Sequence, residues 1–329
     1  IRDRASNSYD ALVVIVGSSS LAMPELMAGA LQDCLPLSGK PVIAFVSPHA
    51  PQVTSLLVRR GIPAFTAPES CAAALAGLLL TSNRTAQPAG SPVEQIELPV
   101  IHAGHLDEAE AKQLFVRFGI PCVREVIVRT PNEAADAARE LGGVVVLKVL
   151  SSRIPHKSEM GGVAVGLTVD EIGERLQRMA STVESRAGFQ PDRFLVQEKL
   201  PDGIELILGA RRDSLGTAIL LGTGGVMAEV VRDTTMTLIA PGHGLPLEQA
   251  REMPRRLKSW PLLQGFRGRP ATDLEALARA IAAFSQFAAR MEERLQEAEI
   301  NPLFVFEAGR GVCAADALVI LKSDSPLET

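Results

Sequence analysis

A lysine within an apolar run is the first residue of this sequence whose type suggests chemistry. Lys148 lies in Val144–Val149, where the other residues are Val and Leu. A buried ammonium group without a partner is costly, so this side chain must either meet an anion or extend its tip into water. Two interpretations stay open from this residue alone: a lysine that binds an anionic ligand, and a lysine at a solvent-facing strand edge.

The segment after this run has the composition of a phosphate-binding loop. Residues 151–166 combine basic and hydroxyl side chains with Gly161-Gly162, and His156 is followed by Lys157. Backbone N–H groups and cations in such a loop can bind phosphate. A single histidine more often has a structural role, yet few structural histidines lie in a loop of this composition.

Hard oxygen ligands are concentrated late in the chain. Glu299 and Asn301 stand in the tetrapeptide Glu-Ile-Asn-Pro, and Asp316 follows across a short hairpin. Mg²⁺ typically takes one or two carboxylates together with nucleotide phosphates and water, and a side-chain amide can serve as one ligand. Asn-Pro alone could equally be a turn. The glycine-rich run 222–225 is a weaker signal, because no Gly-Lys-Ser/Thr follows it and a tight strand connection explains it as well.

Composition limits the classes of partner. The net charge of -5 over 329 residues supplies no basic surface, which argues against a nucleic-acid partner. The four cysteines show no CxxC spacing, as is typical of reduced thiols in the cytoplasm. The apolar runs are too short to cross a bilayer and no signal peptide is visible, so we expect a cytoplasmic protein without membrane contact. Because the first residue is Ile rather than Met, we also expect a piece of a longer protein.

The elements that must position these residues divide into two units. Within residues 1–80, three apolar runs alternate with helical stretches, at 11–16, 41–46 and 64–66. Buried strands that alternate with helices predict a parallel sheet, here a small flavodoxin-like domain. Residues 81–105 are rich in Thr, Ser, Asn, Pro and Gly, which predicts a linker.

The second unit, 106–329, alternates helices and strands. Asp107 and Thr130 are each followed three residues later by Glu, which predicts two helix starts. Apolar residues keep helical spacing from Leu274 to Leu295, and we expect these to be core residues of one helix.

The order of these segments resembles the ATP-grasp domain of ADP-forming acyl-CoA synthetases, in the succinyl-CoA-synthetase superfamily. The resemblance covers 106–321, and 1–80 is similar, more weakly, to the family's CoA-ligase-like domain. It implies an α/β protein in which the small flavodoxin-like domain precedes an ATP-grasp domain of two α+β subdomains. The segments that carry it are Val146-Leu147-Lys148-Val149, His156-Lys157-Ser158, Gly161-Gly162-Val163, Gly203-Ile204-Glu205-Leu206, Gly222-Thr223-Gly224-Gly225-Val226, Gly265-Phe266-Arg267-Gly268, Glu299-Ile300-Asn301-Pro302 and Ala315-Asp316-Ala317.

The resemblance implies a site for ATP or ADP. Lys148 would bind the α- and β-phosphates, with Gly161 and Gly162 in the adjoining loop. Glu205 would hold the ribose hydroxyls. The residues at the adenine would be Glu198 and Leu200.

The same resemblance implies a metal site and a phosphate carrier. Asn301 and Asp316 would ligate Mg²⁺, with Glu299 close by, although many relatives carry Asp at the position of Glu299. His156 would be the catalytic histidine of a mobile loop that relays phosphate between sites.

The implied reaction is the reversible conversion of acid, CoA and ATP to acyl-CoA, ADP and phosphate. We expect this chain to supply the nucleotide-binding half, with CoA and a carboxylic acid bound by further domains, as a homo-oligomer or in complex with those domains. The alternative is a non-catalytic regulatory CoA-ligase-like module of a protein acetyltransferase. The match of His156, Asn301 and Asp316 to the family pattern favours the enzyme.

Overall fold

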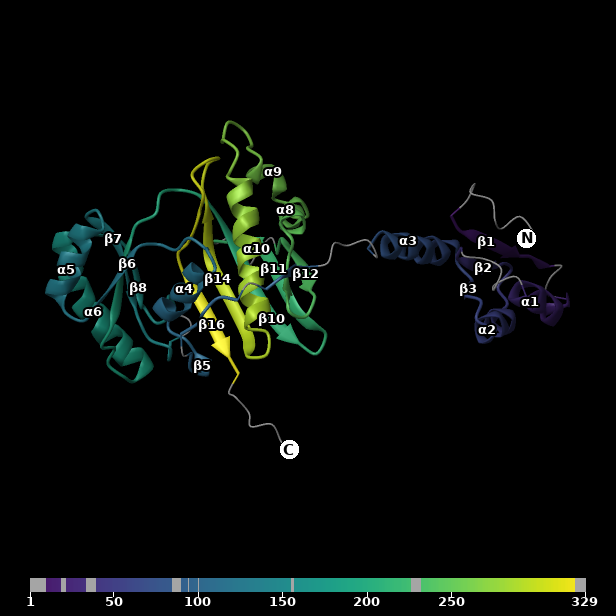
Figure 1. Cartoon of the computed structure of the whole chain (residues 1–329), viewed down its shortest axis with the longest axis horizontal. Helices are drawn as coiled ribbons and strands as arrows, with labels where there is room; N and C mark the ends of the chain where they lie inside the picture. Colours follow the sequence, from purple (N-terminus) through teal and green to yellow (C-terminus); the bar gives the residue numbers. More distant parts are fainter. Residues whose placement is uncertain are drawn as a thin grey trace. The chain divides into compact units, whose positions relative to one another are not determined.

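The computed structural model of the chain divides into two compact units, Ile1–Pro88 and Ala89–Thr329. Figure 1 shows the elements of each unit. For 79–84 the structure describes only the backbone, and the full set of described residues is 10–18, 22–33, 40–84, 90–93, 95–99, 101–154, 157–225 and 232–322.

The first unit contains a three-stranded parallel sheet in the order β1-β2-β3. Proline stands in the first turn of each of its helices, where the missing N–H would have no intrahelical partner. Its core packs the sheet against the helices through aliphatic side chains such as Val46 and Leu57. The predicted α/β class with a small parallel sheet is therefore confirmed. The elements are β1 (Leu12–Val16), α1 (Pro24–Gln32), β2 (Val42–Val46), α2 (Pro51–Arg59), β3 (Ala64–Phe65) and α3 (Pro68–Arg84).

The smaller sheet of the second unit has four antiparallel strands in the order β6-β9-β7-β8. Two helices pack on it through a separate core that includes Met179 and Phe194. The predicted helix start at Thr130 is confirmed, because its side chain accepts the N–H of Glu133. The elements are β6 (Glu125–Val128), α5 (Pro131–Glu140), β7 (Val144–Val149), β8 (Val163–Thr168), α6 (Val169–Ala187) and β9 (Phe194–Glu198).

The larger sheet has seven strands, six of them in the order β12-β11-β10-β14-β16-β5, with β15 paired to β14. All of its pairings are antiparallel. The strands are β5 (Gly104–His105), β10 (Ile204–Asp213), β11 (Gly216–Thr223), β12 (Thr234–Ile239), β14 (Leu295–Val305), β15 (Val312–Ala314) and β16 (Ala317–Leu321).

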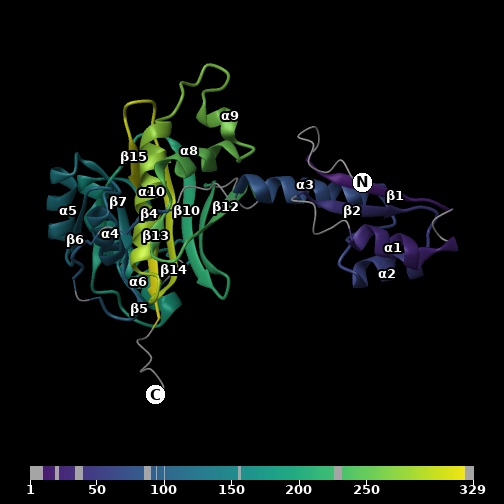
Figure 2. The ribbon, with the colours of Figure 1, turned by 45° about the vertical axis from the view of Figure 1, so that its right-hand side comes forward.

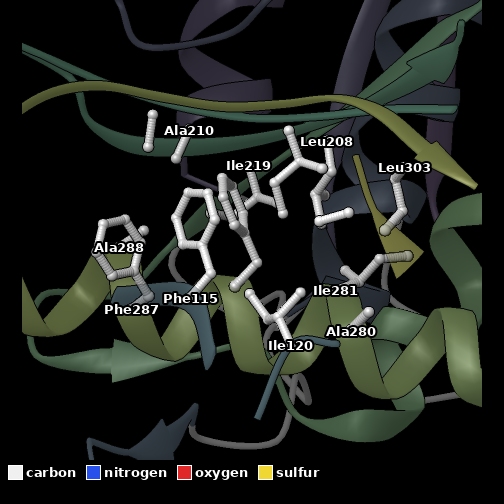
Figure 3. Packing of buried hydrophobic residues seen from close by; sticks show 14 of the residues in the cluster. Phe115, Ile120, Leu208, Ala210, Ile219, Ala280, Ile281, Phe287, Ala288 and Leu303 are labelled. Atoms are coloured by element: carbon white, nitrogen blue, oxygen red, sulfur yellow. The ribbon is translucent and has the colours of Figure 1, made fainter. Parts of the chain in front are cut away.

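One face of the larger sheet is covered by helices, of which α10 runs along the strands in both views (Figures 1 and 2). Phe115 of α4 meets Phe287 of α10 edge to face, with ring centroids 5.1 Å apart. Figure 3 shows these rings between α10 and the sheet residues Leu208 and Ile219. The covering helices are α4 (Glu108–Arg117), α8 (Leu247–Arg255), α9 (Trp260–Leu263) and α10 (Leu274–Arg290).

The stretch predicted as a single helical stripe, Leu274 to Leu295, divides between two elements. The helix ends at Arg290, and Leu295 is the first residue of β14. Leu295 is nevertheless fully buried, because it enters the same core from the strand. The prediction that Leu295 is a core residue is confirmed, whereas its assignment to the helix is wrong.

The range 81–105 contains more regular structure than a linker. It begins with the last residues of α3, and it holds β4 (Ser91–Pro92), which pairs with β13 (His243–Gly244). It ends with β5, whose His105 pairs with Ile320 of β16. Within the described part of the chain, the structure holds no helix long and apolar enough to cross a membrane.

Candidate functional site

A cavity of about 460 Å³ in the second unit is lined by residues from both of its sheets. The smaller sheet contributes the loop that follows β7, and the larger sheet contributes strands β14 and β16. The polar residues of the lining include Glu108, Ser151, Ser152, Lys157, Ser158, Glu297, Glu299, Asn301 and Asp316.

Strand alternation places the oxygen ligands of β14 on the cavity side. Successive side chains of a strand point to opposite faces, and Ala298 and Ile300 are buried in the core. Glu299 and Asn301 therefore face the cavity, and the Asn301 amide donates to Glu299 Oε1 at 3.0 Å. Asp316 immediately precedes β16, the neighbour of β14, and lines the same cavity.

Lys148 is buried and paired with carboxylates of the chain, which excludes the solvent-facing strand edge. Its Nζ donates to Glu108 Oε1 at 2.8 Å, to Asp316 Oδ2 at 2.9 Å and to the backbone oxygen of Ala315 at 3.0 Å. Burial lowers the pKa of Lys148, but the Glu108 and Asp316 carboxylates outweigh that effect and raise the pKa above its ordinary value. Lys148 is therefore a permanent cation beside the cavity.

Glu108 is the site residue that sequence reasoning missed. It is the first residue of α4, and its fully buried carboxylate lies 2.7 Å from Lys112 Nζ and 2.8 Å from Lys148 Nζ. Gln197 Nε2 donates to it at 2.7 Å, and Lys157 contacts it as well. Burial raises the pKa of Glu108, but Lys148, Lys112 and Lys157 together bring the pKa well below the ordinary range of a glutamate.

The loop after β7 reaches the same carboxylates through Lys157. Its Nζ contacts Glu108 and lies 3.4 Å from Asp316 Oδ1. Gly162 N–H donates to the Lys157 backbone oxygen at 2.8 Å, and a Cβ at Gly162 would lie only 3.1 Å from that oxygen. Gly161 has φ +73°, a backbone conformation that favours glycine. His156 lies outside the described residues.

The residues predicted to contact the base and the ribose lie outside the cavity lining. Glu198 ends β9, and its carboxylate accepts the backbone N–H and the Nε–H of Arg124 at 3.0 and 2.7 Å. Leu200 packs against the buried cluster of Val123, Phe306 and Cys313. Glu205, on β10, approaches the glycine-rich run, because a Cβ added to Gly225 would lie 2.9 Å from Glu205 Oε2.

The donor chemistry of the cavity suits a hard cation that is shared with phosphate. Its ligands are carboxylate and amide oxygens, the type that Mg²⁺ prefers. In the described residues, no group of three or more His, Cys, Asp or Glu side chains is arranged to hold a metal ion. The set of Glu299, Asn301 and Asp316 matches a metal that takes some of its ligands from a nucleotide.

Comparisons with known proteins identify the family. Residues 101–321 match the ATP-grasp domain family. The chain is 34% identical over 221 residues to the beta subunit of an ADP-forming acetate–CoA ligase I from Pyrococcus furiosus, covering 66% of this chain and 91% of the relative. It is also 34% identical over 266 residues to a trans-feruloyl-CoA synthase from an unknown prokaryotic organism, covering 80% of this chain and 37% of that protein.

Solved structures give the same result. A dinucleotide-forming acetyl-coenzyme A synthetase 1 from Ca. Korarchaeum cryptofilum, in complex with coenzyme A and Mg-AMPPCP, is 30% identical with a TM-score of 0.56. The match covers 75% of this chain and 99% of that one. The family match covers the part of the chain that contains the cavity residues, and the sequence relative and the structural neighbour are enzymes of the same kind. This chain belongs to the ATP-grasp family and, within it, to the ADP-forming acyl-CoA synthetases.

Proposed function

We propose that this chain supplies the nucleotide-binding half of an ADP-forming acyl-CoA synthetase. The reaction joins an acid to CoA at the expense of ATP, releases ADP and phosphate, and is reversible. The observation that carries the proposal is that Lys148 and Lys157 both form ion pairs with Asp316 at the cavity. Glu299 and Asn301 line the same cavity. Cations for phosphate and oxygen ligands for a metal thus stand side by side.

Each predicted residue has a role in this proposal. Lys148 binds the α- and β-phosphates, with the loop amides around Gly161 and Gly162 beside it. The Glu205 carboxylate accepts hydrogen bonds from the ribose hydroxyls, and Glu198 and Leu200 contact the adenine. Positioning and charge neutralisation supply most of the catalysis in phosphoryl transfer.

Mg²⁺ would be held by Asn301 and Asp316, with Glu299 close by. When bound, the metal neutralises charge on the phosphate oxygens. Both oxygens of Asp316 are within reach of a lysine in this structure. On nucleotide binding, Lys148 and Lys157 would turn from Asp316 to the phosphates, and the Asp316 oxygens would become free to hold the metal.

His156 is the proposed carrier between the nucleotide site and the acyl site. Its neutral imidazole would attack the γ-phosphorus, so that a P–N bond forms while the P–O bond to ADP breaks and the ring proton leaves. Mass spectrometry that preserves phosphohistidine, on the complete enzyme with ATP and Mg²⁺, tests this role. A His156→Ala enzyme should bind nucleotide but lose turnover, and wild-type turnover by that variant would exclude the carrier.

The partners of this half follow from the same proposal. CoA and the carboxylic acid bind on other domains, and the chain works in a complex with them or as a homo-oligomer. One relative is named as a beta subunit, and the match to the feruloyl-CoA synthase covers 37% of that longer protein.

Isothermal titration of the 329-residue chain with ADP, with and without Mg²⁺, tests the central part of the proposal. We expect binding that Mg²⁺ strengthens, because Asp316 would hold the metal and Lys148 and Lys157 would then be free to contact phosphate. A folded sample that shows no heat of binding at millimolar Mg·ADP would contradict it.

A further inference from the structure

Glu108 has no capacity left for a metal or a nucleotide. A carboxylate offers about four lone-pair positions. Four side-chain nitrogens of the chain reach it, from Lys112, Lys148, Lys157 and Gln197. Its side chain is 0% exposed, whereas that of Asp316 is 29% exposed. Glu108 is therefore suited to hold cations in place and not to bind a ligand itself.

Glu108 and Asp316 share the same two lysines, Lys148 and Lys157. If Asp316 held a metal ion, both lysines would leave that carboxylate, because a cation there would repel the two ammonium groups that now lie 2.9 and 3.4 Å from it. Glu108 would then be the carboxylate that continues to hold both lysines. It fixes where they stand while Asp316 changes partner.

Lys157 extends this anchoring to the loop. The side chain of Lys157 contacts Glu108, and its backbone oxygen accepts the Gly162 N–H. Lys157 therefore links Glu108 to the turn 157–162. A Lys157 held at Glu108 fixes one end of that turn.

We propose that Glu108 is a positioning residue that couples nucleotide binding to the loop 157–162, through Lys148 and Lys157. The nucleotide part of this inference rests on the proposed function, whereas the anchoring of the loop does not. Glu125 is the matched control. It contacts Lys112 and Gln197 of the same network, at 2.5 and 2.8 Å, and its contacts do not include Lys148 or Lys157.

The experiment compares the 329-residue chain with Glu108→Gln, Glu108→Asp, Lys157→Met and Glu125→Gln. Hydrogen exchange of the amides in 157–162 is measured without nucleotide, and Mg·ADP affinity is measured by titration. Loss of a hydrogen bond to a charged group is worth about a tenfold change. We expect Glu108→Gln to exchange about tenfold faster in this loop and to bind Mg·ADP about tenfold more weakly.

The other variants separate positioning from a merely structural role. Glu108→Asp, which keeps the charge, should fall between wild type and Glu108→Gln. Lys157→Met should reproduce the faster loop exchange, and it carries the test if Glu108→Gln does not fold. Glu125→Gln should change both measurements less than Glu108→Gln does, because Glu125 contacts Lys112 and Gln197.

Three results would overturn the inference. The first is unchanged exchange at 157–162 in Glu108→Gln or in Lys157→Met. The second is an equal response in Glu125→Gln, which would show general loosening of the network. The third is tighter Mg·ADP binding by Glu108→Gln, which would show that Glu108 only competes with phosphate for the lysines. A wild-type chain that binds no nucleotide contradicts the proposed function instead, and the exchange measurement still decides the anchoring.

Discussion

The two sheets of the second unit contribute opposite charges to one cavity. The four-stranded sheet brings cations, from Lys148 on β7 and Lys157 in the loop after it. The seven-stranded sheet brings oxygen ligands, from Glu299 and Asn301 on β14 and from Asp316 before β16. The lysines that reach Asp316 come from the four-stranded sheet and its loop, whereas Glu299, Asn301 and Asp316 come from the seven-stranded sheet, so the site requires the two sheets together.

The difference follows from how each strand is buried. β7 lies between β8 and β9, and most of its residues are buried, so Lys148 depends on anions from elsewhere. β14 has one face on the core and the other toward the cavity, so it can present polar side chains at alternate positions without burying them. A charged residue in a buried strand such as β7 therefore needs partners from distant parts of the chain. The polar residues on the cavity face of β14 do not, because that face is not buried.

The largest effect we expect comes from the core beneath the carboxylates. Phe115→Ala should lower the free energy of unfolding by about 3–5 kcal/mol, because the buried ring packs against the rings of Phe284 and Phe287. Urea denaturation measures it. Because α4 also carries Glu108, this variant should weaken nucleotide binding too. Met179→Ala, in the core of the smaller sheet, should cost about 2–5 kcal/mol. A loss below about 1 kcal/mol for Phe115→Ala would show that this core does not hold α4 in place.

Replacing the cation tests the smaller sheet's contribution. Lys148→Met should weaken Mg·ADP binding about a hundredfold, since truncating one member of a buried, hydrogen-bonded charge pair between two binding partners typically costs about 2–5 kcal/mol of binding free energy. Titration calorimetry measures the affinity. Lys258→Met changes an exposed lysine in the same way and should leave the affinity unaltered. Equal affinities for the two variants would remove Lys148 from the site.

Replacing a carboxylate tests the larger sheet's contribution. Asp316→Ala should reduce the strengthening of ADP binding by Mg²⁺ about tenfold, while binding without Mg²⁺ changes less. Titrations at several Mg²⁺ concentrations give the ratio, with Asp170→Ala, an exposed change on α6, as the control. If the dependence on Mg²⁺ were the same in both variants, the metal would have other ligands.

The smallest effect should come from the end of β9. Glu198 and Arg124 form an ion pair whose side chains are 22% and 64% exposed, and exposed pairs are worth less than about 1 kcal/mol. Glu198→Gln keeps an acceptor for the Arg124 N–H, so we expect ADP affinity to fall only about threefold. A loss as large as that of Lys148→Met would move the centre of the site toward β9.

The sequence predicted Lys148, Glu299 and Asn301 as site residues, but it did not predict Glu108, the buried carboxylate that pairs with Lys148. A lysine among Val and Leu, and Glu299 with Asn301 two positions later, are local patterns that burial and alternation explain. Glu108 could not be found in this way, because an acid in the first turn of a helix is typical of any capped helix. Its burial depends on Lys112, Lys148, Lys157 and Gln197, and only Lys112 is near it in sequence. The assignment of Leu295 to the helix was wrong for the opposite reason, because the helical spacing of apolar residues continued past the end of the helix at Arg290.

Hydrogen exchange of the chain with and without Mg·ADP tests most directly whether the two sheets form one nucleotide site. The account predicts that peptides containing Lys148 and Lys157 and peptides containing Asn301 and Asp316 become protected together. Lys148→Met should abolish both protections at the same nucleotide concentration. Protection confined to one sheet, or protection near Asp316 that survives Lys148→Met, would contradict a site built from both.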